Sequence, residues 1–375
     1  MKTVFVCTTI HHPANISEFV KNLVRHGHSG KTEFIVIGDR KSPTDTAAYL
    51  EKTCTKEIPV HYHDLPAQKK WLEKFPELDR VIPVDRIQRR NIGYLLACEI
   101  GATTIVSIDD DNFPLANEDY LAGHANVGKT ARLRSYETKN GWYNVCEELI
   151  TSPKNQFYHR GFPLKFRWSK DEKRVDQLSA RVAVNAGFWL GDPDIDTFAR
   201  LTEPFEVTGS HLNTSFTLAR GTWSPFNSQN TAYLAEMLPA LFLLIEGRPL
   251  KNLSVWRYDD IWMSYFARKI IDQKGDLVSY GAPWVRQKRN PHDFLLDLER
   301  EIMPLRLTNR LVNSLRQVSL TGTGSYGELY SELCEALGRE FETSSDYDRE
   351  EKDYFREMIS NMKVWSKTCR ELMGS

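Results

Sequence analysis

The chain has 375 residues, of which 41% are hydrophobic and 26% are charged, and its formal net charge is −1. These values are ordinary for a globular protein, and they exclude the strongly basic composition of proteins whose main partner is nucleic acid or an anionic membrane. The length exceeds one average domain, so we expect one large domain with an appendage.

The cysteines and the apolar runs bear on the cellular compartment and on whether the chain crosses a membrane. None of the six cysteines forms a Cys-x-x-Cys pair, and Cys7 and Cys98 fall in apolar runs where a reduced thiol packs as a small hydrophobe. The longest apolar run, 238–245, contains Pro239 and is far shorter than the roughly 20 residues that cross a membrane. We therefore expect a cytoplasmic protein with no membrane span.

The N-terminal part alternates short β-branched runs with amphipathic stretches. Strands are predicted at 4–10 and 33–38, and helices at 16–26, after Pro43, at 67–74 and from about 85 to 100. The run 103–108 is almost continuously apolar, as in a strand buried within a parallel sheet. This order predicts βαβ units and an α/β fold with a mainly parallel sheet.

The pattern is less regular between 129 and 230, where Gly, Pro and aromatic residues interrupt it. Irregular strands and loops are expected there, forming the other wall of a cleft. A helix is predicted at 260–271, ended by Gly275, and a mostly helical region follows about residue 293. The predicted division is an α/β domain over 1–290 and a helical C-terminal region over 291–375.

Three consecutive aspartates, Asp109, Asp110 and Asp111, follow the predicted strand 103–108. Strand alternation would point Asp109 and Asp111 to one side and Asp110 to the other. Neighbouring buried carboxylates repel each other, and Mn²⁺ or Mg²⁺ relieves this by binding carboxylate and diphosphate oxygens together. We expect a metal at Asp109 and Asp111 and nucleotide-sugar contacts at Asp109 and Asp110; a polar turn is the alternative.

Other polar residues are expected at the same sheet edge, where open α/β sheets bind ligands. Thr8 and Thr9 end the first predicted strand, and Asp39 follows the second, where a carboxylate commonly binds a ribose, although a Gly-Asp turn explains it equally well. Arg90 and Asn91 lie on the helix that leads into the aspartates. They are predicted to reach the nucleotide, with a solvated helix face as the alternative.

A second acidic pair, Asp259 and Asp260, opens the helix predicted near residue 260. Aspartate is a good N-cap residue, so the structural interpretation is a helix cap. One cap residue is enough for one helix. We therefore expect a catalytic role for the pair, as a general base or as a ligand of the reacting sugar.

A series of short segments follows in order along the chain: Ser-Ile-Asp-Asp-Asp at 107–111, Arg-Gly-Phe-Pro-Leu-Lys-Phe-Arg at 160–167, Gly-Phe-Trp-Leu-Gly-Asp-Pro-Asp at 187–194, Gly-Thr at 221–222, Arg-Tyr-Asp-Asp-Ile-Trp at 257–262, Asn-Pro at 290–291 and the late Trp365. In this order the segments resemble the reversibly glycosylated polypeptide family, the plant-type UDP-arabinopyranose mutases, which are similar to glycosyltransferases of the A-type fold. The N-terminal segments 11–13 and 38–43 look more like a STELLO-type glycosyltransferase branch.

The resemblance implies a glycosyltransferase A-type fold with metal and UDP at the three aspartates. It implies a nucleotide-sugar contact at Gly187, and it aligns Arg167 with the arginine that carries the sugar reversibly in the family. A protonated guanidinium is a poor nucleophile, so physical chemistry favours Arg167 as a clamp on the diphosphate or the transition state.

Together these observations predict a metal-dependent glycosyltransferase that moves a sugar from a nucleotide diphosphate, most simply UDP, to a hydroxyl acceptor such as a carbohydrate. One alternative is a UDP-sugar pyranose/furanose mutase with self-glycosylation. Another is a non-catalytic, self-glycosylated partner subunit. The composition predicts no nucleic-acid partner and is compatible with a homo-oligomer.

Overall fold

A computed structural model describes residues 1–169, 171–202 and 204–374. The strands are β1 (Thr3–Thr8), β2 (Thr32–Ile37), β3 (Val60–His63), β4 (Thr104–Asp109), β5 (Asn112–Pro114), β6 (Thr130–Thr138), β7 (Leu149–Ser152), β8 (Lys173–Gly191), β9 (Glu206–Ser210), β10 (Phe216–Leu218), β11 (Asn230–Leu234), β12 (Pro249–Leu250), β13 (Leu253–Ser254) and β14 (Leu277–Gln287). The α-helices are α1 (Ala14–Arg25), α2 (Thr46–Thr53), α3 (Leu65–Leu72), α4 (Pro76–Val81), α5 (Arg90–Glu99), α6 (Tyr120–Gly123), α7 (Thr197–Thr202), α8 (Asp259–Lys274), α9 (Phe294–Gln317), α10 (Tyr326–Thr343) and α11 (Arg349–Met373). The 3₁₀ turns are η1 (Ser29–Lys31), η2 (Ile87–Arg89), η3 (Val145–Glu148), η4 (Leu164–Phe166) and η5 (Ala235–Ala240).

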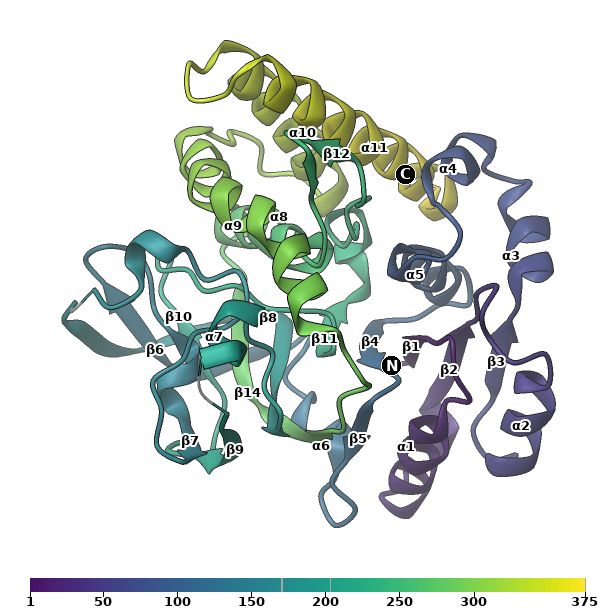
Figure 1. Cartoon of the computed structure of the whole chain (residues 1–375). Helices are drawn as coiled ribbons and strands as arrows, with labels where there is room; N and C mark the ends of the chain where they lie inside the picture. The colour runs from purple at the N-terminus through teal and green to yellow at the C-terminus, as the bar shows by residue number, and fades with distance from the viewer. Residues whose placement is uncertain (170, 203, 375) are drawn as a thin grey trace.

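One sheet of twelve described strands forms the centre, in the order β3-β2-β1-β4-β11-β8-β6-β10-β14-β5, with β7 and β9 attached beside β8 (Figure 1). The first four strands of this order are parallel. Strands β1, β2 and β4 are apolar almost throughout because both of their faces are buried, whereas β3 at the edge is partly exposed. The α/β fold is confirmed, and the carboxyl ends of β1, β2 and β4 meet at one edge, as predicted.

Beyond β4 the sheet is mixed. Strand β11 runs antiparallel to β4 and β8, β8 runs antiparallel to β6, and β14 runs parallel to β8. Loops are found between 129 and 230, as expected. The expectation of irregular strands there did not anticipate the long regular strand β8, which has 19 residues. The half of β8 from Val182 onward is largely buried, and β11 connects it to β4 of the parallel half.

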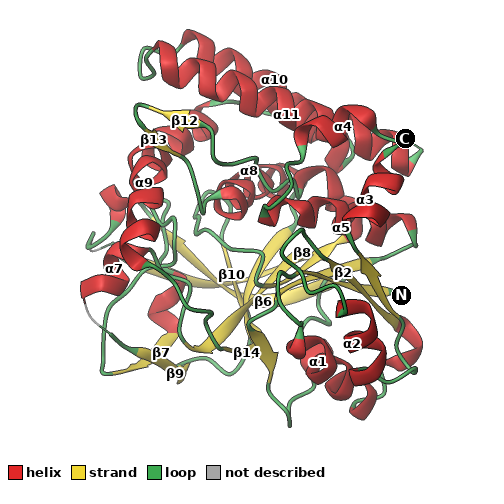
Figure 2. Ribbon diagram, turned by 45° about the vertical axis from the view of Figure 1, so that its right-hand side comes forward, coloured by secondary structure: helices red, strands yellow, loops and turns green. Residues whose placement is uncertain are grey.

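Helix α5 lies against β1 and β2, whereas α1 and α2 lie on the other side of the sheet (Figure 2). Gly93 permits this close packing, because a Cβ atom there would lie 2.5 Å from Cγ1 of Val6. The helix predicted from residue 85 begins only at Arg90, since Asp85 has a φ of 60°, which no right-handed helix contains. The segment 85–89 is instead a loop and a 3₁₀ turn above the sheet edge.

The C-terminal region is helical, as predicted, and α9, α10 and α11 pack over α8, η5 and α5. Trp365 of α11 is buried, and its ring nitrogen donates to the carbonyl of Pro239 at 3.0 Å. Helix α8 ends at Gly275, which adopts the left-handed conformation of a helix C-cap. The boundary at residue 290 remains a prediction. None of the helices in the described ranges is long and apolar enough to cross a membrane.

Candidate active site

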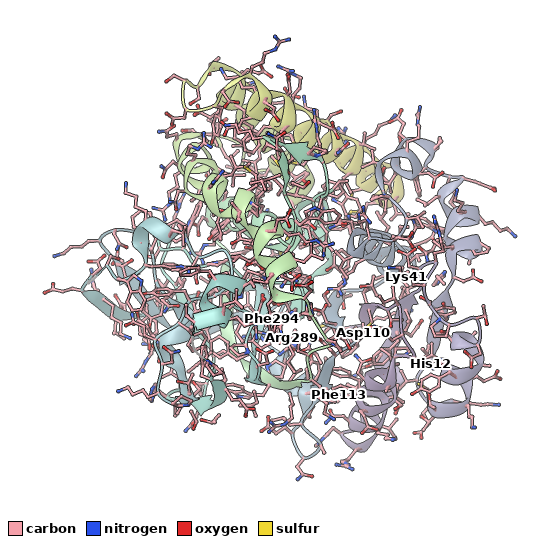
Figure 3. The ribbon with its side chains drawn as sticks, viewed as in Figure 1. His12, Lys41, Asp110, Phe113, Arg289 and Phe294 are labelled. Carbon is pink, nitrogen blue, oxygen red and sulfur yellow. The ribbon has the colours of Figure 1, made fainter. Side chains whose placement is uncertain are left out.

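The carboxyl ends of β1 and β4 and the N-terminus of α8 face one cavity of about 390 Å³. We call the residues at the strand ends, Thr8 and Asp109 to Asp111, the strand wall, and the residues around the start of α8, Glu246, Asp259 and Asp260, the helix wall. Asp110 and Arg289, which both line the cavity, lie near each other between the two halves of the molecule (Figure 3). A second cavity of similar size adjoins the first, and the two share Thr8, Asp85, Arg86, Ile87, Asp110, Asn290 and His292.

Arg90 holds the strand wall together from the first turn of α5. Its side chain is 1% exposed and donates to Oγ1 of Thr8 at 2.9 Å and to Oδ1 of Asp109 at 2.5 Å. It also donates to Oγ of Ser228 at 2.9 Å. The alternative of a solvated helix face is therefore wrong for Arg90, which is a buried counter-ion of Asp109.

The predicted alternation of the three aspartates is wrong, because β4 ends at Asp109 and the next two residues form a turn. All three line the first cavity. Asp110 accepts a hydrogen bond from Oγ1 of Thr9 at 2.7 Å. Burial, reinforced by the charges of Asp109 and Asp110, raises the pKa of Asp111 to about 7. Asp111 is therefore the carboxylate of this wall that most needs a cation.

The strand wall fits a divalent ion only as part of a larger donor set. Asp109 already pairs with Arg90, and Asp111 meets Nε2 of Gln287 only at 3.5 Å. Among the residues that the structure describes, no group of three or more His, Cys, Asp or Glu side chains could hold a metal alone. Mg²⁺ and Mn²⁺ commonly take one or two carboxylates and complete their shell with phosphate oxygens and water. The wall fits an ion of that kind.

The helix wall is not organised as a simple cap. The residue before α8 is Tyr258, which makes no side-chain cap. The carboxylate of Glu246 takes that place, since its Oε1 accepts the amide hydrogens of Tyr258 at 2.6 Å and of Asp259 at 2.9 Å. The capping interpretation of Asp259 and Asp260 is therefore wrong, and both carboxylates are available for other contacts.

Asp260 and Asp259 have different partners. Asp260 accepts from the amide of Ser228 at 2.9 Å and from its hydroxyl at 3.1 Å, and it lies 3.4 Å from the guanidinium of Arg160. Asp259 accepts from Nε2 of Gln88 at 2.9 Å. Because the hydroxyl of Ser228 also meets Arg90, this serine connects the two walls of the cavity.

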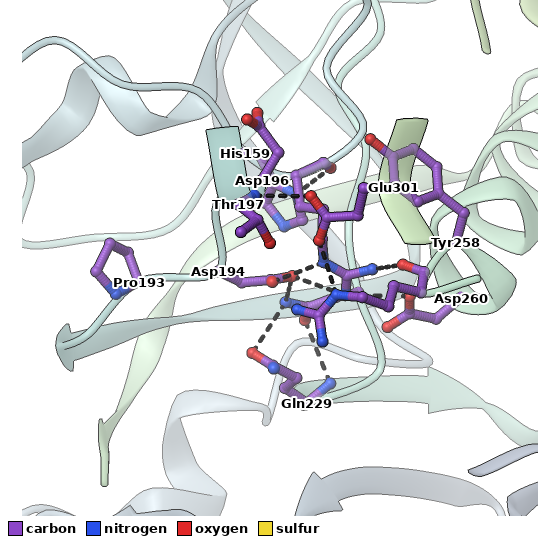
Figure 4. A network of polar contacts seen from close by, with 12 residues as sticks. His159, Pro193, Asp194, Asp196, Thr197, Gln229, Tyr258, Asp260 and Glu301 are labelled. Carbon is purple, nitrogen blue, oxygen red and sulfur yellow. Dashed lines mark hydrogen bonds and ion pairs between the residues drawn. The ribbon is translucent and has the colours of Figure 1, made fainter. Parts of the chain in front are cut away.

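Arg160 is the main site residue that sequence reasoning missed. Its buried guanidinium binds Asp194 through two hydrogen bonds, at 2.8 and 3.1 Å, and reaches Asp260 and the carbonyl of Arg257. Figure 4 shows Asp194 and Asp260 within this network of polar contacts. Burial alone would raise the pKa of Asp194, but the charge of Arg160 holds it well below its ordinary value. The only sequence signal was the position of both residues inside the segments 160–167 and 187–194.

Three predicted site residues lie elsewhere. Asn91 is buried and exchanges two 2.8 Å hydrogen bonds with the backbone of Leu243, so it joins a core loop to α5. A Cβ atom at Gly187 would lie 2.4 Å from Nδ2 of Asn230, so this glycine permits close packing inside the sheet. The structure therefore does not bring Asn91 or Gly187 to the two cavities, and the nucleotide contacts expected at these residues have no support from their core positions.

The third, Arg167, lies outside the group of side chains that line the two cavities. It pairs with the buried carboxylate of Asp196, donates to the carbonyl of Phe162, and lies 5.4 Å from the ring centre of Tyr158. A role as clamp or attachment site remains a prediction. Of the two arginines in the segment 160–167, Arg160 lines the first cavity and Arg167 does not.

The second cavity contains Thr8, Thr9 and Asp39, as the sheet-edge argument predicted. Asp39 also stabilises its own turn, because it accepts the amide hydrogens of Arg40 at 2.7 Å and Arg86 at 3.1 Å. The turn interpretation of Asp39 is therefore confirmed, and its contact with a ribose remains a prediction.

Arg86 lines both cavities, and its guanidinium lies 4.6 Å from the ring centre of Trp256. None of the ion pairs among the described side chains involves this guanidinium, which leaves its charge available to an anionic ligand. No sequence motif pointed to it, because only the fold brings residue 86 to the junction of the cavities.

The sequence matches known proteins over most of its length. The model of the family described as "Reversibly glycosylated polypeptide" matches residues 77–373. UDP-arabinopyranose mutase 3 of Arabidopsis thaliana is 27% identical over 217 residues, which cover 57% of this chain and 54% of that protein. UDP-arabinopyranose mutase 1 of the same plant is 25% identical over 291 residues, covering 76% and 72%. The chain thus spans about half of the first of these relatives.

Solved structures also align with the chain. Glucosyl-3-phosphoglycerate synthase from Mycobacterium tuberculosis has a TM-score of 0.42 at 12% identity, with 82% of this chain and 79% of that chain covered. S. aureus TarS in complex with UDP-GlcNAc has a TM-score of 0.37 at 12% identity, with 99% and 92% covered. The family model spans well over half of the sequence, and the chain therefore belongs to the reversibly glycosylated polypeptide family.

Proposed function

We propose that the chain is a nucleotide-sugar enzyme that breaks the bond between a diphosphate and the anomeric carbon of the sugar, and that it acts as a UDP-sugar pyranose/furanose mutase. One observation carries the proposal: two walls of carboxylates, differing in their partners, face a single cavity that adjoins a second one. A nucleotide sugar has the matching division into nucleoside, diphosphate and sugar.

The ligand is proposed to lie across both cavities. The nucleoside would occupy the second cavity, where Asp39 and Thr9 offer an acceptor and a hydroxyl to the ribose. The diphosphate would lie at the shared wall beside the unpaired charge of Arg86. The sugar would then face Asp259, Asp260 and the strand-wall aspartates.

A divalent ion, Mn²⁺ or Mg²⁺, is proposed to bind at Asp109 and Asp111 together with the diphosphate oxygens, where it would stabilise the charge of the departing group. Residues of the chain itself hold the carboxylates of the site in position. Arg90 keeps the carboxylate of Asp109 in place, and Arg160 keeps that of Asp260 in place. Preorganised charges of this kind lower the cost of charge separation in the transition state.

A glycosyltransferase, the function expected first from the sequence, shares every step up to the departure of the diphosphate. The names of the relatives, UDP-arabinopyranose mutases, favour isomerisation of the sugar on the same nucleotide. A mutase needs no external acceptor. It needs groups that can give a proton to one sugar oxygen and take one from another, which carboxyl groups of the helix wall can do.

Incubation of the purified chain with UDP-arabinopyranose and Mn²⁺, followed by chromatographic separation, tests the proposal. An isomeric nucleotide sugar is the expected product. Free UDP with a new glycoside on an added acceptor would indicate a transferase, and labelled protein without turnover would indicate a self-glycosylated subunit. GDP- and dTDP-sugars serve as controls for the base, and a metal-free sample with chelator tests the need for the ion.

A further inference from the structure

One side chain from a distant part of the sequence joins two carboxyl groups of the helix wall. Nε2 of Gln88, in the turn η2, donates to Oδ2 of Asp259 at 2.9 Å and to Oε2 of Glu246 at 3.1 Å. The two oxygens therefore lie within the roughly 6 Å over which like charges disfavour each other's ionisation. All three side chains line the first cavity.

No cation among the described side chains pairs with these two carboxyl groups. Arg160 pairs with Asp194 and Asp260, and none of the ion pairs among the described side chains includes Glu246 or Asp259. The other charged or titratable groups that face the pair are Arg160 from the loop before η4, Asp260 from α8 and Tyr354 from α11. Two negative charges in this setting would be costly, whereas one negative charge and one proton would not.

We propose that Glu246 and Asp259 hold one proton between them, that Gln88 fixes their geometry, and that Asp259 thereby exchanges a proton with the bound sugar. Glu246 and Gln88 are positioning residues, and Asp259 is the group that touches the substrate. Burial, followed by the charge of Glu246, raises the pKa of Asp259 well above its ordinary value, and burial raises the pKa of Glu246 to about 7. These directions agree with the geometry.

A shared proton suits the reaction that the proposed function requires, on which this inference rests. When the pyranose of a nucleotide sugar becomes a furanose, the bond between C1 and the diphosphate breaks and is formed again at the end. Between these two events the bond between C1 and O5 breaks and a bond between C1 and O4 forms. O5 gains a proton and O4 loses one. The carboxyl pair gives its proton to O5 and takes back the proton that leaves O4, so the enzyme returns to its starting state without any oxidant, reductant or second substrate.

Two conservative variants should shift the pH dependence of kcat/KM in opposite directions. Glu246→Gln keeps an oxygen for the amides of Tyr258 and Asp259 but removes the neighbouring charge. Loss of activity at high pH should therefore occur at least about one pH unit lower than in the wild type. Gln88→Met removes the donor that stabilises both carboxylates, so the loss should occur at higher pH. Glu137→Gln, at an exposed carboxylate on β6, is the control and should leave the profile unchanged.

A purely structural role of Glu246 and Gln88 would lower stability or kcat and leave the shape of the pH profile as in the wild type, which would overturn the inference.

A second measurement does not depend on turnover. It is carbon-13 NMR of the carboxyl groups from pH 4 to 9, with Asp111→Asn and Asp259→Asn to identify the resonances. The Asp259 carboxyl should titrate above its ordinary range and should shift downward in Glu246→Gln. If it does so without sugar isomerisation, the proposed function fails and the shared proton stands. If Asp259 titrates in its ordinary range in an active enzyme, the shared proton fails and the proposed function stands.

Discussion

The strand wall and the helix wall both present aspartates to one cavity, but they are built differently. In the strand wall the three aspartates are consecutive in the sequence, and Arg90 pairs with one of them from the preceding helix. In the helix wall the contacts come from residues 88, 160 and 228, far from Asp259 and Asp260 in the sequence, and from Glu246 in the segment before α8. The strand wall follows from a local rule of α/β sheets, whereas the helix wall depends on the complete fold.

Because their carboxylates have different partners, we infer that the two walls have different functions. The strand wall has an excess of carboxylate around Asp111, which suits a cation and a diphosphate. In the helix wall, Arg160 and Ser228 hold Asp260, while Asp259 and Glu246 share only a neutral amide. Such a contrast between neighbouring carboxyl groups is typical of sites that perform proton transfer.

The largest expected effect comes from removing the cation that holds the helix wall. Arg160→Met should lower the free energy of unfolding by about 3–5 kcal/mol, because Asp194 and Asp260 would be left buried without their counter-ion. Urea unfolding followed by circular dichroism measures this loss. Arg174→Met, at an exposed ion pair on β8, is the matched control and should change stability little. Equal losses in the two variants would contradict the role given to Arg160.

Asp111→Asn should separate ligand binding from folding in the strand wall. The variant should fold normally, since asparagine carries no charge that burial penalises. It should lose more than about a hundredfold of its Mn²⁺-dependent affinity for UDP, because one of the two expected metal ligands is gone. Calorimetric titration with UDP, with and without Mn²⁺, is the measurement. Unchanged affinity in the presence of metal would remove Asp111 from the site.

The same variant should alter how stability depends on pH. A carboxyl group whose folded pKa is raised from an unfolded value near 4 to about 7 binds more protons when folded, so its contribution to stability falls as pH rises through that window. Asparagine makes no such contribution. The stability of Asp111→Asn relative to the wild type should therefore rise by roughly 1–3 kcal/mol from pH 4 to pH 7 and then level off. Urea midpoints at a series of pH values would show a constant difference if Asp111 titrates normally.

Arg167→Lys should have the smallest effect. Lysine keeps a positive charge beside Asp196, and Arg167 lies outside the cavity walls, so UDP affinity and turnover should change by less than about tenfold, which corresponds to about 1.4 kcal/mol. Steady-state kinetics test this. A variant that binds UDP normally but has lost its turnover or all protein-bound sugar would place Arg167 in the reaction after all.

The sequence was informative where function follows from local order. The apolar strand, the aspartates after it and the residues ending β1 and β2 could be placed together, because parallel strands bring their carboxyl ends to one edge. Side-chain direction at Asp110 could not be predicted in the same way, since β4 ends at Asp109 and alternation does not extend into the turn that follows.

The remaining site residues are set by contacts that no local pattern encodes. Glu246 follows an apolar run and carries no motif, yet it caps α8 from outside the helix. Arg160 and Arg167 are indistinguishable by residue type, and only the fold shows which one reaches the cavity. Asn91 and Gly187 look equally suited to a ligand in sequence, but the packing of Leu243 and Asn230 occupies them.

The division of labour between the walls is tested most directly by comparing turnover with UDP affinity in Asp259→Asn and Asp260→Asn. Because Glu246 caps α8, both variants should keep the fold, although Asp260→Asn should lose some stability because Arg160 then keeps only Asp194 as its charged partner. We expect turnover to fall by roughly a hundredfold or more in at least one of them while UDP affinity stays intact, the reverse of the loss in Asp111→Asn. Wild-type turnover in both variants would contradict the account, because the helix wall would then have no part in the chemistry.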